Sequence, residues 1–365
     1  MFELKRWIET NGIKRVGLAR FYRSASEKIG RAKNAGSLDI FYTKKFLADE
    51  CGIDADVIRV TDKVDFSKYD LLIFQPYTFI MFGGIWEAHA VDFIYDYCRH
   101  FEGTVMCIYN DPNVMWSNPL RVLDARNRVL REGEIVADEF DRSLIESFES
   151  KKFVGMFIGR DFDRFKALAK ATQSTFWPDE IINVKLSEYI HHNQLLESSV
   201  DDVDPSSKKY DVVYYGSNRG GGRNRQMKKI FGKNETLKLR WIGYDPKFPN
   251  VDWTKKVKYD DLGPLINECL TSFVAGDPAH DDNIVIYRFY EALKFNVVNL
   301  ISRQFDPEMK LLNHPTLQDV CYVESLEDVE KACKKLRESQ AFYNTILRLQ
   351  RDEILRVAAS WRNDG

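Results

Sequence analysis

The sequence predicts an α/β protein with two doubly wound domains, each a parallel sheet covered by helices on both faces. Strand-like and helix-like segments alternate along the chain, a rhythm that is typical of βαβ units. A polar stretch at 193–209, NQLLESSVDDVDPSSKK, interrupts this rhythm, which then restarts. The chain has 365 residues, more than one ordinary hydrophobic core needs, so two domains are expected.

In the first half, short apolar runs predict strands and longer mixed segments predict helices. The predicted strands are 15–21, 55–60, 70–75 and 104–111, and the predicted helices are 39–52 and 87–101. Gly52 is expected to end the first of these helices, because glycine adopts the left-handed conformation found after a helix terminus.

The second half repeats the pattern after the polar stretch. The predicted strands are 210–217, 237–244, 271–277 and 297–302, and the predicted helices are 223–232, 261–270, 284–296 and 341–361. We therefore expect a first domain at 1–192, a second at 193–340, and a C-terminal helical segment at 341–365 that packs back on the first. Ligands of open α/β sheets bind at the carboxyl ends of the strands, so the site is expected in a cleft between the domains.

The composition excludes several classes of protein. Hydrophobic residues make up 44% and charged residues 30% of the chain, which is ordinary for a globular protein. No apolar run approaches the roughly 20 residues needed to cross a bilayer, and the N-terminus lacks the apolar core of a signal peptide. Six cysteines occur without C-x-x-C spacing, which argues against a zinc site or a disulfide framework. A cytoplasmic protein without a membrane partner is expected.

The charge is unevenly distributed. A net charge of −2 excludes a globally basic nucleic-acid binder, but residues 1–45 hold eleven Lys or Arg against four acids, a local balance of +7. A second basic run comprises Arg121, Arg126, Arg128 and Arg131. These side chains would hold phosphates if they share a face, and the simpler alternative is a solvated helix surface.

The most informative segment follows the strand that ends at Tyr215 and reads GSNRGGGR. Its consecutive glycines let the backbone approach a ligand closely, and the N-terminus of the next helix offers free N–H groups to a phosphate. Arg219 and Arg223 are four residues apart, and each can donate paired hydrogen bonds to the oxygens of a diphosphate. A diphosphate site is the preferred interpretation, and a surface loop with ordinary arginines is the alternative. The segment matches neither a Walker A loop nor G-x-G-x-x-G.

Two further segments carry candidate side chains. Arg288 and Glu291 share one face of a predicted helix, where the glutamate would accept hydrogen bonds from a ribose; an ordinary surface ion pair is the alternative. Asp111 follows a predicted strand in CIYNDPNVMWSNP, where a catalytic carboxylate would face the cleft. From the residues alone, a turn-forming Asn-Asp-Pro sequence is the preferred explanation of that position. The DPAHDD loop and the Asp161-x-Asp163 pattern are interpreted as helix-capping acids rather than metal ligands.

Together these segments resemble the T-even phage DNA β-glucosyltransferases, which have the GT-B architecture, over about residues 37–310. The loop pattern Gly-Ser-x-Arg-x-x-x-Arg matches the diphosphate clamp of that family, and FDPEM at 305–309 falls in register. The resemblance implies that Arg288 binds the donor, that Glu291 holds the ribose and that Asp111 is the catalytic base. The residues assigned to UDP are Gly216, Ser217, Arg219, Gly221, Arg223, Gly243, Arg288 and Glu291.

The resemblance also predicts an acceptor surface. Phe82, Gly83 and Gly84 match a Phe-Gly-Gly loop of the family. The apolar residues before this loop stand where the family has an asparagine, and we expect them to insert between stacked bases of the DNA. The DNA-binding residues are then Phe79, Ile80, Met81, Phe82, Gly83, Arg121 and Arg126. A glutamate that contacts the sugar in the family falls near Ser37 and Asp39 only if a gap is allowed, so glucose and a pentose such as arabinose both stay open.

The resemblance implies an inverting transfer from a UDP-sugar to the hydroxyl of a 5-modified cytosine in duplex DNA. The enzyme would work as a monomer in the bacterial cytoplasm during phage infection. A divalent cation is compatible with this reaction, although the sequence offers no evident set of metal ligands. Two alternatives stay open: a GT-B transferase with another acceptor, and a non-catalytic module that binds nucleotides or DNA.

Overall fold

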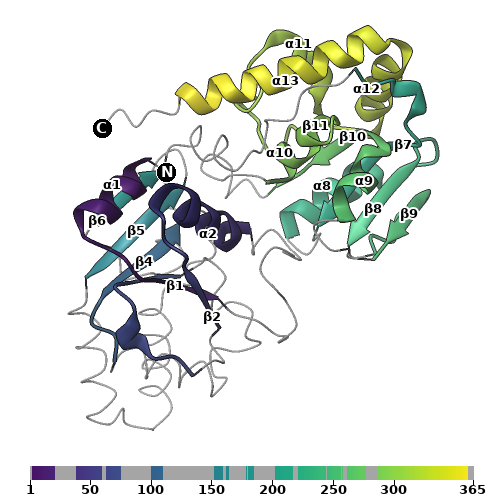
Figure 1. Ribbon diagram of the computed structural model, residues 1–365. Helices are drawn as coiled ribbons and strands as arrows, with labels where there is room; N and C mark the ends of the chain where they lie inside the picture. Colours follow the sequence, from purple (N-terminus) through teal and green to yellow (C-terminus); the bar gives the residue numbers. More distant parts are fainter. Residues whose placement is uncertain are drawn as a thin grey trace. The chain divides into compact units, whose positions relative to one another are not determined.

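A computed structural model gives the positions of fourteen segments of the chain. They are residues 2–20, 38–59, 63–74, 100–109, 152–158, 162–163, 178, 180–184, 202–216, 221–243, 245–255, 257, 261–276 and 287–360. The chain divides into two compact units (Figure 1). One comprises 1–188 with 282–284, and the other comprises 189–281 with 285–365.

The first unit contains a parallel sheet of six strands in the order β2-β1-β3-β4-β5-β6. The strands are β1 (Val16–Arg20), β2 (Asp56–Arg59), β3 (Leu71–Phe74), β4 (Thr104–Tyr109), β5 (Phe153–Ile158) and β6 (Glu180–Val184). The described helices are α1 (Phe2–Thr10), α2 (Leu38–Cys51) and the short 3-10 helix η2 (Phe66–Lys68). Strands β3 and β5 are buried throughout, as expected for central strands covered on both faces. All four strands predicted in this half are confirmed.

Two local features define where elements of this unit begin and end. Helix α2 ends at Cys51 because Gly52 follows with a φ of +67°, which confirms the predicted stop. Asp70, just before β3, accepts hydrogen bonds from the backbone N–H groups of Lys14 and Arg15 at 3.0 and 2.9 Å. The Arg15 side chain also donates to Asp70, at 2.9 Å. This carboxylate therefore joins the starts of two neighbouring strands, β1 and β3.

The second unit contains another parallel sheet of six strands, in the order β12-β11-β10-β7-β8-β9. Numbered within the unit, this is the 3-2-1-4-5-6 order of a Rossmann fold. The strands are β7 (Tyr210–Gly216), β8 (Leu239–Gly243), β9 (Val251–Thr254), β10 (Cys269–Val274), β11 (Val298–Ser302) and β12 (Tyr322–Val323). The helices are η4 (Pro205–Ser207), α8 (Gly221–Phe231), α9 (Leu262–Asn267), α10 (Tyr287–Lys294), α11 (Pro315–Cys321), α12 (Leu326–Glu338) and α13 (Gln340–Ser360).

The strand order reverses between β7 and β10, which lie side by side at the centre of the second sheet. Such a reversal leaves a crevice at the carboxyl ends of the two strands, because their connections run to opposite sides. In the first sheet the corresponding reversal lies between β1 and β3. The predicted class of two doubly wound α/β domains is therefore confirmed.

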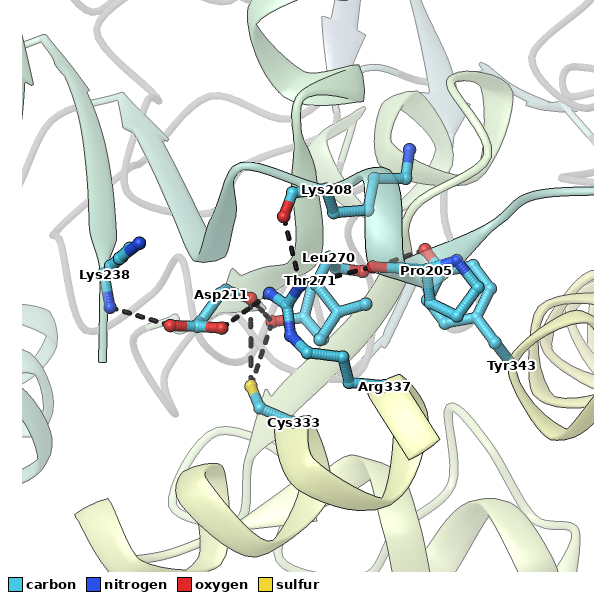
Figure 2. Close-up of polar contacts among 9 residues, drawn as sticks. All are labelled: Pro205, Lys208, Asp211, Lys238, Leu270, Thr271, Cys333, Arg337 and Tyr343. Carbon is cyan, nitrogen blue, oxygen red and sulfur yellow. Dashed lines mark hydrogen bonds and ion pairs between the residues drawn. The ribbon is translucent and has the colours of Figure 1, made fainter. Parts of the chain in front are cut away.

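A polar cluster joins the start of β7 to helix α12 at the opposite end of the second sheet (Figure 2). Arg337 donates to the Asp211 carboxylate at 2.7 Å and to the carbonyl oxygens of Pro205 and Lys208 at 3.3 and 3.1 Å. The other carboxylate oxygen of Asp211 accepts from the backbone N–H of Lys238 at 2.8 Å. Residues 202–209 belong to the stretch predicted as a linker, and these contacts hold that part in one conformation.

Helix α13 packs against elements of the second unit. It contacts β11, α10, α11 and α12. The buried Gln350 side chain accepts from the backbone N–H of Asn299 in β11 at 2.9 Å and donates to the carbonyl oxygen of the same residue at 2.8 Å. Strand β12 pairs with Ile301 and Ser302, near the end of β11. At Asn299, nearer the start of β11, the Gln350 side chain makes the backbone hydrogen bonds that a neighbouring strand would otherwise make. In the described part of the chain, the helices are too short or too polar to span a membrane.

Candidate functional site at the switch point of the second sheet

Two glycines end neighbouring strands at the carboxyl edge of the second sheet. Gly216 ends β7 with a φ of +121°, and Gly243 ends β8, its neighbour in register, with a φ of +133°. A Cβ atom on Gly243 would lie 2.6 Å from the carbonyl oxygen of Gly216. Glycine is therefore required by both backbone conformation and space, and the main chain lies open where the predicted diphosphate loop begins.

Arg288, near the start of α10, lies beside these glycines. Its guanidinium carbon is 4.9 Å from the ring centroid of Tyr214, and a Cβ on Gly216 would lie 3.6 Å from that carbon. The carbonyl oxygen of Arg288 accepts a hydrogen bond from the Tyr215 hydroxyl at 2.8 Å. Two consecutive residues of β7 thus position this arginine: Tyr214 contacts its side chain, and Tyr215 contacts its backbone.

The guanidinium of Arg288 is charged and has an unused donor. Burial tends to lower the pKa of Arg288, but Tyr214, Tyr215 and Glu291 raise it above its ordinary value. Its buried Nη1 atom has no hydrogen-bond acceptor among the residues that the structure describes. A buried donor without an acceptor costs free energy, about 1–3 kcal/mol or more when it is charged, unless a ligand satisfies it. The arrangement suits an anion at the end of β7.

Glu291 lies one turn farther along α10 and is only 3% exposed. Burial and the Glu291 carboxylate raise the pKa of the Tyr215 hydroxyl well above its ordinary value. A buried glutamate between Arg288 and Tyr215 is not the solvent-exposed ion pair that the sequence left open as an alternative. Its position fits a carboxylate that accepts hydrogen bonds beside an anion site.

Helix α8 begins close to the switch point and is held there by a buried amide. Gln226 donates to the carbonyl oxygen of Gly276, just after β10, at 2.8 Å. Gly221 is the first residue of the helix, and Arg223 is half-buried in its first turn. Gly216, Gly243, Arg288 and Glu291 therefore lie together at the ends of β7 and β8 and on α10, and the Gln226 contact places α8 beside the end of β10.

Most of the remaining predicted site residues lie outside the described part of the chain. These are Ser217, Arg219, Asp111, Ser37, Phe79, Ile80, Met81, Phe82, Gly83, Arg121 and Arg126. Asp39 lies in α2, but its side chain is also outside the description. Ser37 comes after β1, the apolar loop after β3, and Asp111 two residues after β4. These three strands are neighbours in the first sheet.

Two residues at this edge of the second sheet were missed in the sequence. Tyr214 stacks on Arg288, and Trp253, 40% exposed on the edge strand β9, donates its indole N–H to the carbonyl oxygen of Gly243 at 3.1 Å. Neither residue belongs to a recognisable sequence motif, because its position at the site depends on the register between strands. Asp306 of FDPEM has a structural role, since its carboxylate accepts from the backbone N–H groups of Lys310 and Leu311 at 3.0 and 2.8 Å.

Metal-binding side chains do not gather in the described segments, where no three His, Cys, Asp or Glu residues lie close enough to hold an ion. Asp163 lies in a helical position, and Asp161 lies outside the described part of the chain.

Comparisons with known proteins give a consistent result. No family model matches the chain. It is 22% identical over 353 residues to the DNA β-glucosyltransferase of enterobacteria phage T4, covering 90% of this chain and 92% of that protein. A structure of the T4 enzyme with UDP and Mn²⁺ aligns with a TM-score of 0.67 and 18% identity, covering 95% of this chain and 97% of the other.

Further structures extend the comparison. A variant of the T4 enzyme with UDP-glucose aligns with a TM-score of 0.66 at 18% identity, and covers the same shares of both chains. An α-glucosyltransferase in complex with UDP aligns with a TM-score of 0.51 at 9% identity, covering 95% of this chain and 96% of that one. The resemblance to the phage DNA β-glucosyltransferases is therefore confirmed along nearly the whole chain, and its two units have the GT-B fold of the T4 enzyme.

Proposed function

We propose that this protein is a DNA glycosyltransferase that moves a sugar from a UDP-sugar to the hydroxyl of a 5-modified cytosine in duplex DNA. The observation that carries the proposal is the buried, charged Nη1 donor of Arg288 beside Gly216, which has no acceptor among the described residues. It lies at the switch point where Rossmann folds bind nucleotides. The T4 relative, named a DNA β-glucosyltransferase and crystallised with UDP-glucose, supports both the donor and the acceptor class.

On the donor side, each residue has a proposed task. The N–H groups at the start of α8, with Ser217, Arg219 and Arg223, would bind the diphosphate. Gly216 and Gly243 leave room for it, because no side chain projects from either strand end. Arg288 would bind a phosphate oxygen, and the Glu291 carboxylate would accept hydrogen bonds from the ribose. A divalent cation bound with the UDP is compatible with this site.

On the acceptor side, Asp111 is the proposed general base. It would take the proton of the acceptor hydroxyl while that oxygen forms a bond to the anomeric carbon from the face opposite UDP. The bond from that carbon to the diphosphate breaks, and UDP leaves as an anion. Arg219, Arg223 and the α8 N–H groups would stabilise the growing negative charge, so no carboxylic acid is needed to protonate the leaving group. The configuration of the sugar is inverted.

The DNA and the sugar each have proposed contacts in the first unit. Phe79, Ile80 and Met81 would enter the base stack, and Phe82 and Gly83 would support that loop. Arg121 and Arg126 would contact backbone phosphates. Ser37 and Asp39 would contact the sugar, and their difference from the glutamate of the family is the reason to include a pentose such as arabinose beside glucose.

Mass spectrometry of nucleosides tests this function directly. Duplex DNA containing hydroxymethylcytosine is incubated with the protein and one UDP-sugar per reaction. The donors are UDP-glucose, UDP-arabinose, UDP-galactose and UDP-N-acetylglucosamine, and unmodified duplex DNA serves as the control. We expect one sugar to add its mass to the modified cytidine only. A protein that binds UDP but gives no modified nucleoside with any donor would contradict a DNA acceptor and favour another acceptor class.

A further inference from the structure

Helix α8 has a strongly basic exposed face beyond the residues assigned to UDP. Arg225, Lys228 and Lys229 are exposed on it, and Lys233 is exposed in the turn that follows. The opposite face, with Gln226, Met227, Ile230 and Phe231, is buried. The segment GGRNRQMKKIF contains no acid. All of its charges are therefore positive, and three of them lie on the side away from the sheet.

The balance of charge on this face differs from that of the whole chain. The chain is nearly balanced, with 53 basic and 55 acidic residues. Some other exposed cations have acidic partners, such as Lys44 with Asp54 at 2.8 Å and Lys335 with Asp319 at 3.1 Å. Within the described segments, the exposed cations Arg225, Lys228, Lys229 and Lys233 form no ion pair with an acid.

The stability of the helix explains only part of this pattern. Lys228 and Lys229 lie in the last turn of α8, where cations are favourable, but Arg223 and Arg225 lie near its N-terminus. A helix N-terminus carries a partial positive charge, so acids in the first turn stabilise it and cations destabilise it by roughly 0.3–1 kcal/mol each. Helix α8 has no acid in its first turn, and Arg223 and Arg225 lie near that end. No Glu–Lys pair at i, i+4 offsets their repulsion. A local conflict of this kind is expected where a ligand supplies the missing negative charge.

The length of the face indicates the kind of ligand. From Arg225 to Phe231, its last residue, α8 advances six positions, or roughly 9 Å at 1.5 Å per residue, and Lys233 follows in the next turn. That span is longer than a diphosphate, and its side chains point to solvent rather than into the switch point. An extended polyanion with regularly spaced charges fits it, and the phosphate backbone of a nucleic acid is such a ligand.

We infer that the exposed face of α8, formed by Arg225, Lys228, Lys229 and Lys233, binds the phosphate backbone of the acceptor duplex beside the modified base. The inference rests on the proposed function, which makes DNA the acceptor. One helix then has two tasks: its N-terminus holds the donor, and its outer face holds the acceptor backbone. These contacts position the duplex without reading its sequence, because phosphates carry no base information.

The salt dependence of DNA binding tests this surface. K228A/K229A removes two of the cations, and K331A/K334A on α12 removes two exposed lysines from another helix of the same unit as a matched control. Affinity for a duplex with hydroxymethylcytosine is measured from 50 to 200 mM salt. Each lost phosphate contact lowers the slope of log K against log salt by about 0.9. We expect a decrease of about 2 for K228A/K229A and none for the control.

Kinetics separate this inference from the proposed function. K228A/K229A is expected to raise KM for DNA roughly ten- to hundredfold at 0.1 M salt, with unchanged UDP affinity and kcat, and K228R/K229R is expected to restore KM. An unchanged slope and KM, or an equal loss in K331A/K334A, overturns the surface even if the wild-type enzyme transfers sugar. Failure of the wild-type protein to transfer any sugar would instead overturn the proposed function. Circular dichroism confirms that each variant is folded.

Discussion

The guanidinium of Arg288 lies over the ring of Tyr214, with 4.9 Å between its central carbon and the ring centroid. Tyr214 is the residue before Tyr215 in β7, whose hydroxyl donates to the backbone of the same arginine. Two consecutive strand residues thus hold one cation from two directions. A cation fixed in this way is ready to meet a phosphate at the end of the strand without first losing side-chain freedom.

Arg288→Lys keeps the positive charge but loses the planar group that stacks on Tyr214. Because such stacking contributes about 0.5–2 kcal/mol, we expect UDP affinity to fall roughly two- to thirtyfold, measured by isothermal titration. Arg303→Lys is the matched control, since Arg303 pairs with Glu324 at 3.1 Å on an exposed part of the same unit. Equal UDP affinity in the wild type and in Arg288→Lys would remove Arg288 from the donor site.

Asp111→Asn keeps the shape of the side chain but removes its ability to accept a proton at neutral pH. General-base catalysis contributes about 10²–10⁴ in rate, so we expect kcat to fall by that factor. UDP affinity should be unchanged, because the diphosphate residues are assigned to the other unit. Single-turnover transfer, followed by mass spectrometry, measures the effect. Transfer at the wild-type rate would show that another group takes the proton.

Gly243→Ala would place a Cβ 2.6 Å from the carbonyl oxygen of Gly216, at a φ of +133° that side chains rarely adopt. We expect the end of β7 to shift, with loss of both thermal stability and UDP affinity. Gly52→Ala is the matched control, because Gly52 has a φ of +67° but no atom within 4 Å of the added Cβ. It should lower stability by about 1 kcal/mol through backbone strain alone and leave UDP binding intact. The same UDP affinity in both variants would contradict the close packing of the two strand ends.

Arg337→Ala removes the cation that joins Asp211 to the carbonyl oxygens of Pro205 and Lys208 (Figure 2). The half-buried Asp211 carboxylate would then keep only the backbone N–H of Lys238 as a partner. Leaving such groups unpaired costs about 1–3 kcal/mol, so the second unit should unfold several degrees lower in calorimetry. Arg348→Ala, on an exposed ion pair with Asp202, is the comparison. A larger loss in that variant would mean that the cluster at Asp211 is of little importance.

The acid stability of the first unit should depend on Asp70. Burial raises the pKa of Asp70, but hydrogen bonds from Arg15 and from the N–H group of Lys14 outweigh it and hold this pKa below the ordinary 3.8. A depressed pKa in the folded state stabilises the protein above pH 3.8, and this contribution is lost as the pH falls further. Asp70→Asn should therefore lower the melting temperature at pH 7 and make its decline below about pH 4 shallower. Parallel melting curves at all pH values would contradict this.

Most strands of both sheets could be predicted from the sequence, because parallel strands are short apolar runs between helical segments. It was less informative for the edge strand β9, whose VDWT is largely exposed, and for the two-residue β12. Strand β5, FVGMFI, is a short apolar run that periodicity alone cannot distinguish from a buried helix. The start of α12 was detectable, since Ser325 and Asp328 form a capping box.

The candidate site was predictable to the extent that local motifs carry it. The glycines after β7 and the Arg288–Glu291 pair lie within short segments, so their spacing indicated a phosphate and a ribose. Tyr214 and Trp253 were not predictable, because only the pairing of β7, β8 and β9 brings them to the same edge. The contacts of α13 within the second unit were not predicted either. An amphipathic pattern shows that a helix has an apolar face but not which surface that face covers.

The contact between Gln350 and the backbone of Asn299 has a consequence for the synthesis of the protein. Until residue 350 has emerged from the ribosome, the outer side of β11 lacks the amide that covers it, and the nascent second sheet carries an open edge. Open edges are sites at which unfinished chains associate. A message truncated within the last helix would therefore yield an aggregation-prone product, even though every residue assigned to the sugar nucleotide had already been translated.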